Sequence, residues 1–393
     1  MTNRAKILVF CDYYLPGYKA GGPLRTLSNM IDLLGDRYSF EVITRDRDLG
    51  EKEPYDSYYT AKKTPVGKAC ITFLSPSQQS FSAIRKVICS SQHDILYLNS
   101  FFSINFSIKP QLLHRIRFSL NRAVILAPRG EFSPAAMKIR GLKKRLYIFM
   151  AQITGSYKKV IWHASSHYEA EDIRRHWGMA ARIIVATDLS AAIKAPLPYN
   201  RTSKVSGCVN VIFLSRISEM KHLDYALQLF DGLKGQVQFD IYGPIEDSGY
   251  WKRCQVIIEQ LPDNISVRYC GEIPNDQVGN ILSRYDLFLL PTKGENFGHA
   301  IFEALSSGCP VLISDRTPWR DLEKLGIGWD VPLESPALFQ EILQGLIDMD
   351  DNTLKQISTR ARAFAASPER QRSTIEMNCT LFDSVLASAY AGR

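Results

Sequence analysis

The chain has 393 residues, of which 45% are hydrophobic and 22% charged, a composition typical of a globular protein with a packed core. At roughly 100–200 residues per domain, this length predicts about two domains. No stretch approaches the roughly 20 uncharged apolar residues of a membrane-spanning helix, and the first residues lack the long apolar segment of a signal peptide. We therefore expect a cytoplasmic protein.

The two halves of the chain differ in charge. Residues 1–195 contain 29 Lys and Arg against 15 Asp and Glu, a net charge of +14, whereas residues 196–393 contain 19 against 25, a net charge of −6. The first half is therefore expected to meet an anionic partner: a phosphorylated substrate, a membrane surface or a nucleic acid. Its basic residues are dispersed, without an RRM, zinc or helix-turn-helix signature, so nucleic-acid binding is the less favoured interpretation.

Short apolar segments recur along the chain and predict strands. They are continuous rather than alternating, as expected for strands buried on both faces of a parallel sheet. They lie at 6–11, 40–44, 71–75, 94–99, 123–128, 159–165 and 182–186, and then at 209–215, 237–243, 265–271, 286–291 and 310–314. Segments with apolar residues at helical spacing, such as 22–34 and 222–233, separate them. This alternation predicts an α/β, doubly wound fold.

The polar, proline-containing segment 191–207 divides the chain into near-equal halves, each of which begins with a strand and a ligand-type loop. We therefore predict two Rossmann-like domains, residues 1–195 and 205–370, facing each other across a cleft. The remaining residues, 371–393, are predicted to form a C-terminal helix that could cross back to the first domain.

Two segments of the first half have features that suit anionic ligands. Gly21 and Gly22 follow the first strand and open a helix, whose N-terminal N–H groups can take a phosphate, although a simple turn explains them equally well. The motif is neither G-x-G-x-x-G nor a P-loop. Residues 138–159 combine lysines and arginines with an apolar middle. This segment could lie on an anionic membrane or form a buried helix with basic ends.

In the second half, Arg216 and Lys221 follow the first strand, five positions apart. They flank a turn just before a helix that is expected to start near Leu223. A guanidinium and an ammonium at the end of a parallel strand suit a diphosphate. On this segment alone, ordinary surface cations are an equally good interpretation.

Two glutamates, Glu295 and Glu303, stand eight positions apart at the transition from a loop to a helix. The loop brings the N–H groups of Phe297 and Gly298 to the positive end of that helix, and glycine allows a ligand to approach closely. Eight residues of helix would span about 12 Å, more than the roughly 5–9.5 Å between paired carboxylates of glycoside hydrolases. Carboxylates that accept hydrogen bonds from sugar hydroxyls fit this spacing better.

Three of these motifs are the Gly21-Gly22 loop, the Arg-x4-Lys pair of Arg216 and Lys221, and the Glu-x7-Glu element of Glu295 and Glu303. Together they resemble the retaining glycosyltransferases of family 4, which have the GT-B architecture. Segments 44–55, 127–147, 163–173 and 316–323 look like a bacterial branch active in surface polysaccharide assembly, such as lipopolysaccharide O-antigen, capsule or exopolysaccharide. The resemblance implies a metal-independent hexosyltransferase without a cofactor. It would transfer a sugar from a UDP- or GDP-sugar to a glycan or a polyprenyl-diphosphate-linked acceptor, with possible peripheral contact to the inner membrane.

The resemblance also implies roles for the donor side. Glu303 would bind the ribose hydroxyls, and Arg216 and Lys221 would neutralise the leaving diphosphate. Glu295 would hold the donor sugar together with the amides of Asn296, Phe297 and Gly298. The first-domain loop at Gly21 and Gly22 would approach the diphosphate.

The acceptor side is less well matched. Many family members have a histidine where this chain has Pro128-Arg129-Gly130. We expect contacts to the acceptor or donor from Asp48, Arg129, Glu131 and His163. Asp48 ends an Asp-x-Asp sequence, for which an acceptor contact is favoured over a metal site. No covalent nucleophile stands out, and the family implies a front-face substitution in which the departing phosphate helps to deprotonate the acceptor hydroxyl.

Other enzymes of the GT-B fold are the alternatives. A nucleotide-sugar epimerase would be expected to lack the combination of Glu-x7-Glu with Arg-x4-Lys. A phosphorylase would need a lysine site for pyridoxal phosphate, which the sequence does not identify.

Overall fold

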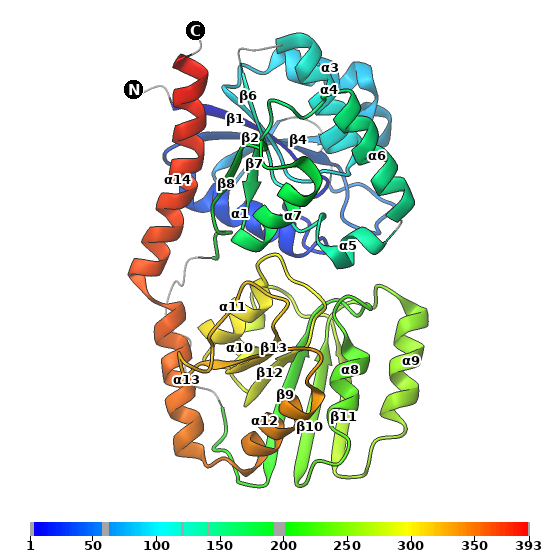
Figure 1. Ribbon diagram of the computed structural model, residues 1–393, viewed down its shortest axis with the longest axis vertical. Coiled ribbons are helices and arrows are strands. Elements are labelled where there is room, and N and C mark those ends of the chain that lie inside the picture. Colours follow the sequence, from blue (N-terminus) through cyan, green and yellow to red (C-terminus); the bar gives the residue numbers. More distant parts are fainter. Residues whose placement is uncertain (1–3, 57–62, 119–121, 140, 192–200, 392–393) are drawn as a thin grey trace. The chain divides into compact units, whose positions relative to one another are not determined.

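The computed structural model describes residues 4–56, 63–118, 122–139, 141–191 and 201–391. They form two units, of which one comprises residues 1–192 together with 369–393 and the other residues 193–368. Most of the predicted linker, residues 192–200, lies outside the described residues. Each unit consists of a central sheet with helices packed against it (Figure 1). Within the described part of the chain, no helix is both long and apolar enough to cross a membrane.

The described residues of the first unit form an eight-stranded sheet in the order β3-β4-β2-β1-β5-β6-β7-β8. The strands are β1 (Lys6–Phe10), β2 (Ser39–Arg45), β3 (Thr64–Val66), β4 (Ala69–Leu74), β5 (Ile95–Leu98), β6 (Ala123–Leu126), β7 (Ile161–Ala164) and β8 (Ile183–Val185). Neighbouring strands are parallel, apart from β3, which pairs antiparallel with β4 at the edge of the sheet. The sequence predicted the other seven and missed β3, because three residues are too short for an apolar pattern.

Helices cover both faces of this sheet. They are α1 (Gly22–Leu34), α3 (Phe81–Ser90), α4 (Lys109–Phe118), α5 (Pro134–Lys138), α6 (Gly141–Ile153), α7 (His167–Trp177) and α14 (Pro368–Ala391), with a 3₁₀ turn at Pro76–Gln79 and a π-helical turn at Ile104–Ile108. Side chains of β1 alternate between the two faces: Ile7 and Val9 pack with α1 and α14, and Leu8 and Phe10 pack with α3 and α6. Burial of both faces explains why the strands are continuously apolar.

The last helix, α14, packs on the first unit although it follows the second unit in the sequence (Figure 1). Its Phe382 ring lies 5.1 Å from the ring of Tyr38, centroid to centroid. The side-chain amide of Asn378 donates a hydrogen bond of 2.8 Å to the Thr187 carbonyl. These contacts join the chain's last helix to the core that β1 and β2 begin.

The second unit contains a fully parallel sheet of six described strands in the order β11-β10-β9-β12-β13-β14. The strands are β9 (Cys208–Leu214), β10 (Gln236–Tyr242), β11 (Ile265–Gly271), β12 (Leu287–Leu290), β13 (Val311–Ser314) and β14 (Gly328–Val331). The helices are α8 (Leu223–Gln228), α9 (Ser248–Ile258), α10 (Val278–Leu282), α11 (His299–Ser306), α12 (Pro336–Asp348) and α13 (Asp351–Ala365). Of these strands only β14 was not predicted, since its four residues include a glycine and an aspartate.

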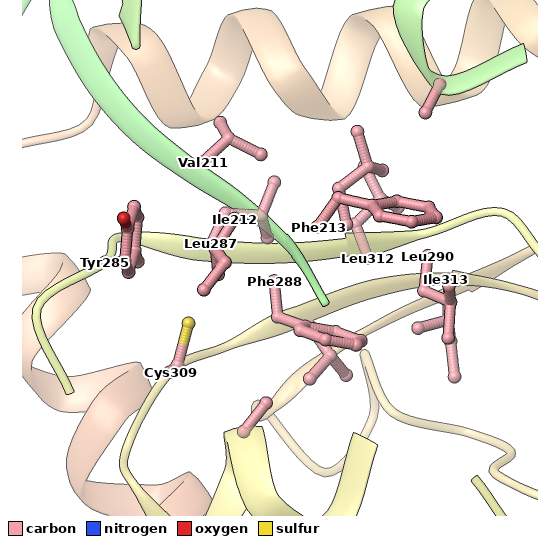
Figure 2. Packing of buried hydrophobic residues seen from close by; sticks show 14 of the residues in the cluster. Val211, Ile212, Phe213, Tyr285, Leu287, Phe288, Leu290, Cys309, Leu312 and Ile313 are labelled. Atoms are coloured by element: carbon pink, nitrogen blue, oxygen red, sulfur yellow. The ribbon is translucent and has the colours of Figure 1, made fainter. Parts of the chain in front are cut away.

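The core of the second unit lies around β9, β12 and β13. Figure 2 shows Ile212, Phe288 and Leu312 packed between the sheet and its helices, and all three side chains are fully buried. A central sheet held in this way fixes where each strand ends. The loops after the strands therefore start from well-defined positions.

Candidate functional site

The order of strands reverses next to the first strand in each sheet. In the second unit the chain runs from β9 outward to β10 and β11, and then returns to β12 on the other side of β9. The loops that leave β9 and β12 diverge at this point, and open α/β sheets bind ligands in the crevice formed there. Arg216 and Lys221 follow β9, whereas Glu295 follows β12. The two predicted donor-side motifs therefore lie on the two loops that border the switch point.

The loop between β12 and α11 has a defined conformation. Gly298 precedes α11 with φ of 81°, a left-handed conformation that favours glycine, and a Cβ there would lie 2.7 Å from the Ile301 side chain. The indole N–H of Trp319 donates to the Phe297 carbonyl at 2.5 Å, and the Glu295 amide donates to the Arg316 carbonyl at 3.0 Å. These contacts hold the loop that leads into the N-terminus of α11.

Lys221 and Glu295 form an ion pair that joins the two loops. The side chains are each 13% exposed, so the pair is mostly shielded but still reaches the surface. A further link comes from the Lys293 amide, which donates to the Met220 carbonyl at 2.9 Å. The sequence predicted both residues of the ion pair but not their direct contact.

Arg216 lies at the same end of β9 and is more accessible. Its guanidinium donates to the Glu246 carboxylate at 2.8 Å, and its side chain is 40% exposed. Glu246 follows β10, and the sequence analysis did not single it out. An acidic residue just after a buried strand was the available signal.

The other predicted donor contacts lie on the same loop and helix. Asn296 is half-buried and Phe297 is buried, both in the loop that precedes α11. Glu303 lies within α11, one turn from its start, and is half-buried. The structure thus places all of these residues in one unit, and their roles in binding stay predictions.

His222 is a further polar residue at this point that the sequence analysis missed. It has φ of 61°, and its Nδ1 lies 3.2 Å from the Pro291 carbonyl oxygen. Its ring stacks on Tyr225 at 4.9 Å, and burial together with Lys293 lowers the pKa of His222. A neutral imidazole is therefore favoured beside the Lys221–Glu295 pair.

In the first unit, the predicted glycine loop lies at the corresponding switch point, between β1 and β5. Gly21 has φ of 70°, and open space surrounds the position that a Cβ would take. Buried Asp48 accepts hydrogen bonds from the amides of Tyr18 at 2.8 Å and Lys19 at 3.2 Å. The structure thus shows Asp48 holding the loop that leads into α1.

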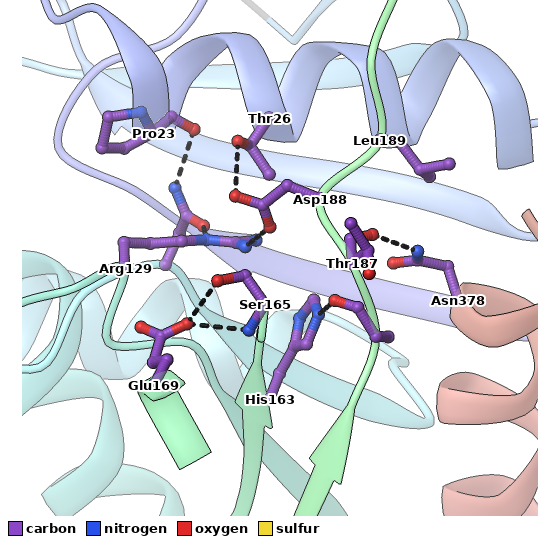
Figure 3. A network of polar contacts seen from close by, with 12 residues as sticks. Pro23, Thr26, Arg129, His163, Ser165, Glu169, Thr187, Asp188, Leu189 and Asn378 are labelled. Carbon is purple, nitrogen blue, oxygen red and sulfur yellow. Dashed lines mark hydrogen bonds and ion pairs between the residues drawn. The ribbon is translucent and has the colours of Figure 1, made fainter. Parts of the chain in front are cut away.

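Arg129 is the centre of a buried polar network (Figure 3). It has φ of 54°, and its guanidinium forms an ion pair with Asp188 in which both side chains are almost fully buried. The same guanidinium donates to Asn99 Oδ1 at 2.8 Å and to Tyr97 Oη at 2.7 Å. Asp188 also accepts from Thr26 of α1 at 3.0 Å. Arg129 thereby connects the ends of β5, β6 and β8 with α1.

His163 is buried and Glu131 is half-buried beside this network. His163 accepts from Tyr97 Oη at Nδ1, 2.7 Å away, and donates from Nε2 to the Ala186 carbonyl at 2.8 Å. Glu131 accepts from the Phe101 amide at 2.6 Å and from Ser100 Oγ at 2.8 Å, and burial raises its pKa. Both residues organise strand ends in this structure, and their contact with an acceptor or donor stays a prediction.

Asn99 and Asp188 were missed by the sequence analysis. Asn99 is the last residue of the predicted strand 94–99, and Asp188 follows the predicted strand 182–186 by two positions, so a polar residue at a strand end was the signal that could have found them. Among the described residues, no group of three or more His, Cys, Asp or Glu is arranged to hold a metal ion.

The His163 environment predicts an acid-sensitive contribution to stability. Burial is the main cause that lowers the pKa of His163 from 6.5 to about 3. Between these values the unfolded chain binds the additional proton, so stability falls as the pH decreases from about 6.5 toward 3. At pH 5 this amounts to about 2 kcal/mol. Urea unfolding at pH 7.5 and pH 5 should show that His163→Gln loses less stability than the parent protein over this interval. The same loss in both proteins would contradict the prediction.

Comparison with solved structures defines the fold class as GT-B. A crystal structure of Anabaena HepE in complex with UDP and glucose superposes with a TM-score of 0.71, covering 98% of this chain and 100% of HepE at 18% identity. Residues 202–364 match the family of glycosyl transferases group 1. The matched residues lie within the second unit and include both donor-side motifs.

Two relatives extend the match to longer parts of the chain. WcaL of Salmonella typhimurium, named as a colanic acid biosynthesis glycosyltransferase, is 27% identical over 194 residues, which are 47% of this chain and 48% of WcaL. The chain thus matches about half of the length of that relative. A 41.2 kDa protein in the cps region of Klebsiella pneumoniae is 23% identical over 337 residues, covering 83% of this chain and 88% of the relative.

Proposed function

We propose that this protein is a glycosyltransferase of surface polysaccharide biosynthesis. It would transfer a hexose from a UDP- or GDP-sugar to a glycan or a lipid-linked acceptor, with retention at the anomeric carbon and without a metal ion. The observation that carries this proposal is the Lys221–Glu295 pair, which places an ammonium and a carboxylate at the switch point of a glycosyl transferases group 1 domain. The polysaccharide context is supported by the names of the relatives.

The contacts of Lys221 suggest how a donor would be bound. Among the described residues, the ammonium has one carboxylate, that of Glu295, as its ion-pair partner. A diphosphate carries more negative charge than one carboxylate, so the ammonium can exchange Glu295 for the donor. Glu295 would then be released to accept hydrogen bonds from the donor sugar, and Glu303 would accept from the ribose.

The proposed reaction is a substitution on one face of the donor sugar. The bond between the anomeric carbon and the diphosphate oxygen breaks, and the acceptor oxygen bonds to the same face of that carbon. The hydroxyl proton passes to the departing phosphate oxygen. Negative charge grows on the diphosphate during this step, so Lys221 and Arg216 stabilise the transition state more than the ground state. The first unit would bind the acceptor.

The proposal is tested by separating the roles of the two glutamates. Glu303→Gln should weaken binding of UDP or GDP alone by about tenfold or more, because hydrogen bonds to charged groups contribute roughly 1.5–3 kcal/mol. Glu295→Gln should leave binding of the bare diphosphate intact, since it removes a competitor for Lys221, but it should slow transfer. Calorimetry with each diphosphate, followed by turnover with the matched sugar nucleotide, measures both effects.

A matched control is Glu341→Gln, which changes an exposed glutamate on α12 and should alter neither quantity. All titrations contain EDTA, so binding that returns only with Mn²⁺ or Mg²⁺ would overturn metal independence. Equal weakening of the bare diphosphate by Glu295→Gln and Glu303→Gln would show that the division between sugar and ribose is wrong.

A further inference from the structure

Helix α6 presents a row of large apolar side chains to the outside of the first unit. Leu142, Leu146, Phe149, Met150 and Ile153 are between 50% and 85% exposed. At 3.6 residues per turn, all five lie within an arc of about 100° of the helix surface. Single exposed apolar residues are common on proteins, but five on one helix face indicate a surface that is covered by a partner. We call these five residues the α6 stripe.

The opposite side of α6 is firmly packed. Ile148 and Ala151 are buried in the core that covers one face of the first sheet. Tyr147 Oη lies 2.6 Å from Tyr157 Oη, and the Tyr147 ring lies 5.4 Å from that of Phe101. The helix is therefore anchored through one face, and the α6 stripe is its second apolar face. This excludes the interpretation of residues 138–159 as a wholly buried helix.

Positive charge surrounds the α6 stripe. By helical spacing, Lys143 and Arg145 border it on either side, and both are exposed. Lys138, Lys158 and Lys159 are exposed near the two ends of the helix. Residues 132–168 contain no Asp or Glu, so none of these five cations has an acidic residue close to it in the sequence.

The charge asymmetry of the whole chain is concentrated in this region. Residues 95–168 contain 12 Lys and Arg but only one acidic residue, Glu131. Glu131 is half-buried and its carboxylate is hydrogen-bonded to Ser100 and Phe101, and one acidic residue is too few to offset the charge of these cations. The face around α6 therefore combines exposed apolar side chains with an excess of exposed positive charge.

We propose that the α6 stripe and its flanking cations dock this protein on an anionic lipid bilayer. The apolar side chains would enter the interface between headgroups and acyl chains, while the cations would contact the anionic headgroups. A second copy of the chain is the less suitable occupant, because a two-fold contact through this face would place the same cations against one another. The inference does not depend on the proposed enzymatic activity.

Vesicle flotation of the full chain tests this inference without a donor or an acceptor. The protein should float with vesicles of phosphatidylcholine and phosphatidylglycerol, and much less with phosphatidylcholine alone. Binding should weaken at 1 M salt, where the Debye length falls to about 3 Å. Lys143→Glu with Arg145→Glu should reduce partitioning by about thirtyfold or more, since each basic residue near the surface contributes about 1 kcal/mol. Leu146→Glu with Phe149→Glu should reduce it at least as much.

A matched control introduces the same kinds of change on α9 of the second unit. Lys252 and Val256 are exposed there, and Lys252→Glu with Val256→Glu should leave vesicle binding unchanged. Thermal unfolding of each variant verifies that these surface substitutions preserve the fold. No binding of the parent protein to anionic vesicles would overturn the proposal, as would equal losses in the α6 and α9 variants. A parent dimer that binds no vesicles and becomes monomeric in Leu146→Glu with Phe149→Glu would instead assign the α6 stripe to self-association.

Discussion

Replacing Lys221 with alanine should lower turnover with a matched sugar nucleotide by about 10²–10³-fold, the loss expected when one preorganised donor to a developing negative charge is removed. The ammonium lies at the switch point of the second unit, where its partner in the structure is Glu295. Because the charge on the leaving diphosphate grows toward the transition state, the substitution should reduce kcat more than it weakens donor binding. Arg216→Ala should act in the same direction.

Steady-state kinetics together with calorimetry for the bare diphosphate separate these effects. Lys221→Arg tests whether charge alone suffices, and the exposed Lys234, changed to alanine, is the control for loss of a lysine in the same unit. Lys221→Ala also leaves the Glu295 carboxylate without its ammonium, so thermal unfolding of the variant must be compared with that of the parent. Near-normal turnover in a folded Lys221→Ala protein would remove this residue from the proposed mechanism.

Asp188→Ala should destabilise the first unit by about 3–5 kcal/mol, the typical cost of leaving one partner of a buried ion pair without its countercharge. Asp188 and Arg129 are almost completely shielded from solvent, so water cannot replace the lost carboxylate. The substitution also removes the acceptor for Thr26 of α1. The connection between α1 and the strand ends should therefore loosen as well.

Urea unfolding, with hydrogen exchange of peptides from each unit, assigns the loss to the first unit. The control is Asp36→Ala, which breaks the exposed pair with Lys68 and should cost at most about 1 kcal/mol. If Asp188→Ala and Asp36→Ala lower the free energy of unfolding equally, the buried network does not stabilise the unit as argued.

Much of the fold could be predicted because the signals are local. Continuous apolar segments identified all strands except β3 and β14, which are short, lie at sheet edges and carry a proline in one case and a glycine with an aspartate in the other. The residues of the candidate donor site could also be identified from the sequence. In a parallel sheet, residues that directly follow the strands meet at one edge, so Lys221 and Glu295 could be placed there from their positions alone.

The buried network could not be predicted, because its members come from distant parts of the chain. In the sequence, Arg129 has the features of an exposed loop residue. Its ion-pair partner Asp188 lies 59 positions away. A cation at such a position is usually assigned to solvent or to a ligand. Only the packing of β5, β6 and β8 against α1 removes water from the guanidinium and supplies its partners.

The same distinction holds for residues 138–159. Their composition indicated a helix with apolar and basic residues. It did not distinguish a buried helix from a helix that faces a membrane. The choice depends on which face of α6 the rest of the unit covers, and composition carries no information about that. Because Ile148 and Ala151 fill the space over the sheet, the neighbouring Leu146 and Phe149 must point outward. The period of apolar residues and the polar residues at strand ends can be recognised within short segments of the sequence. Burial instead depends on contacts between distant segments, which only tertiary packing brings together.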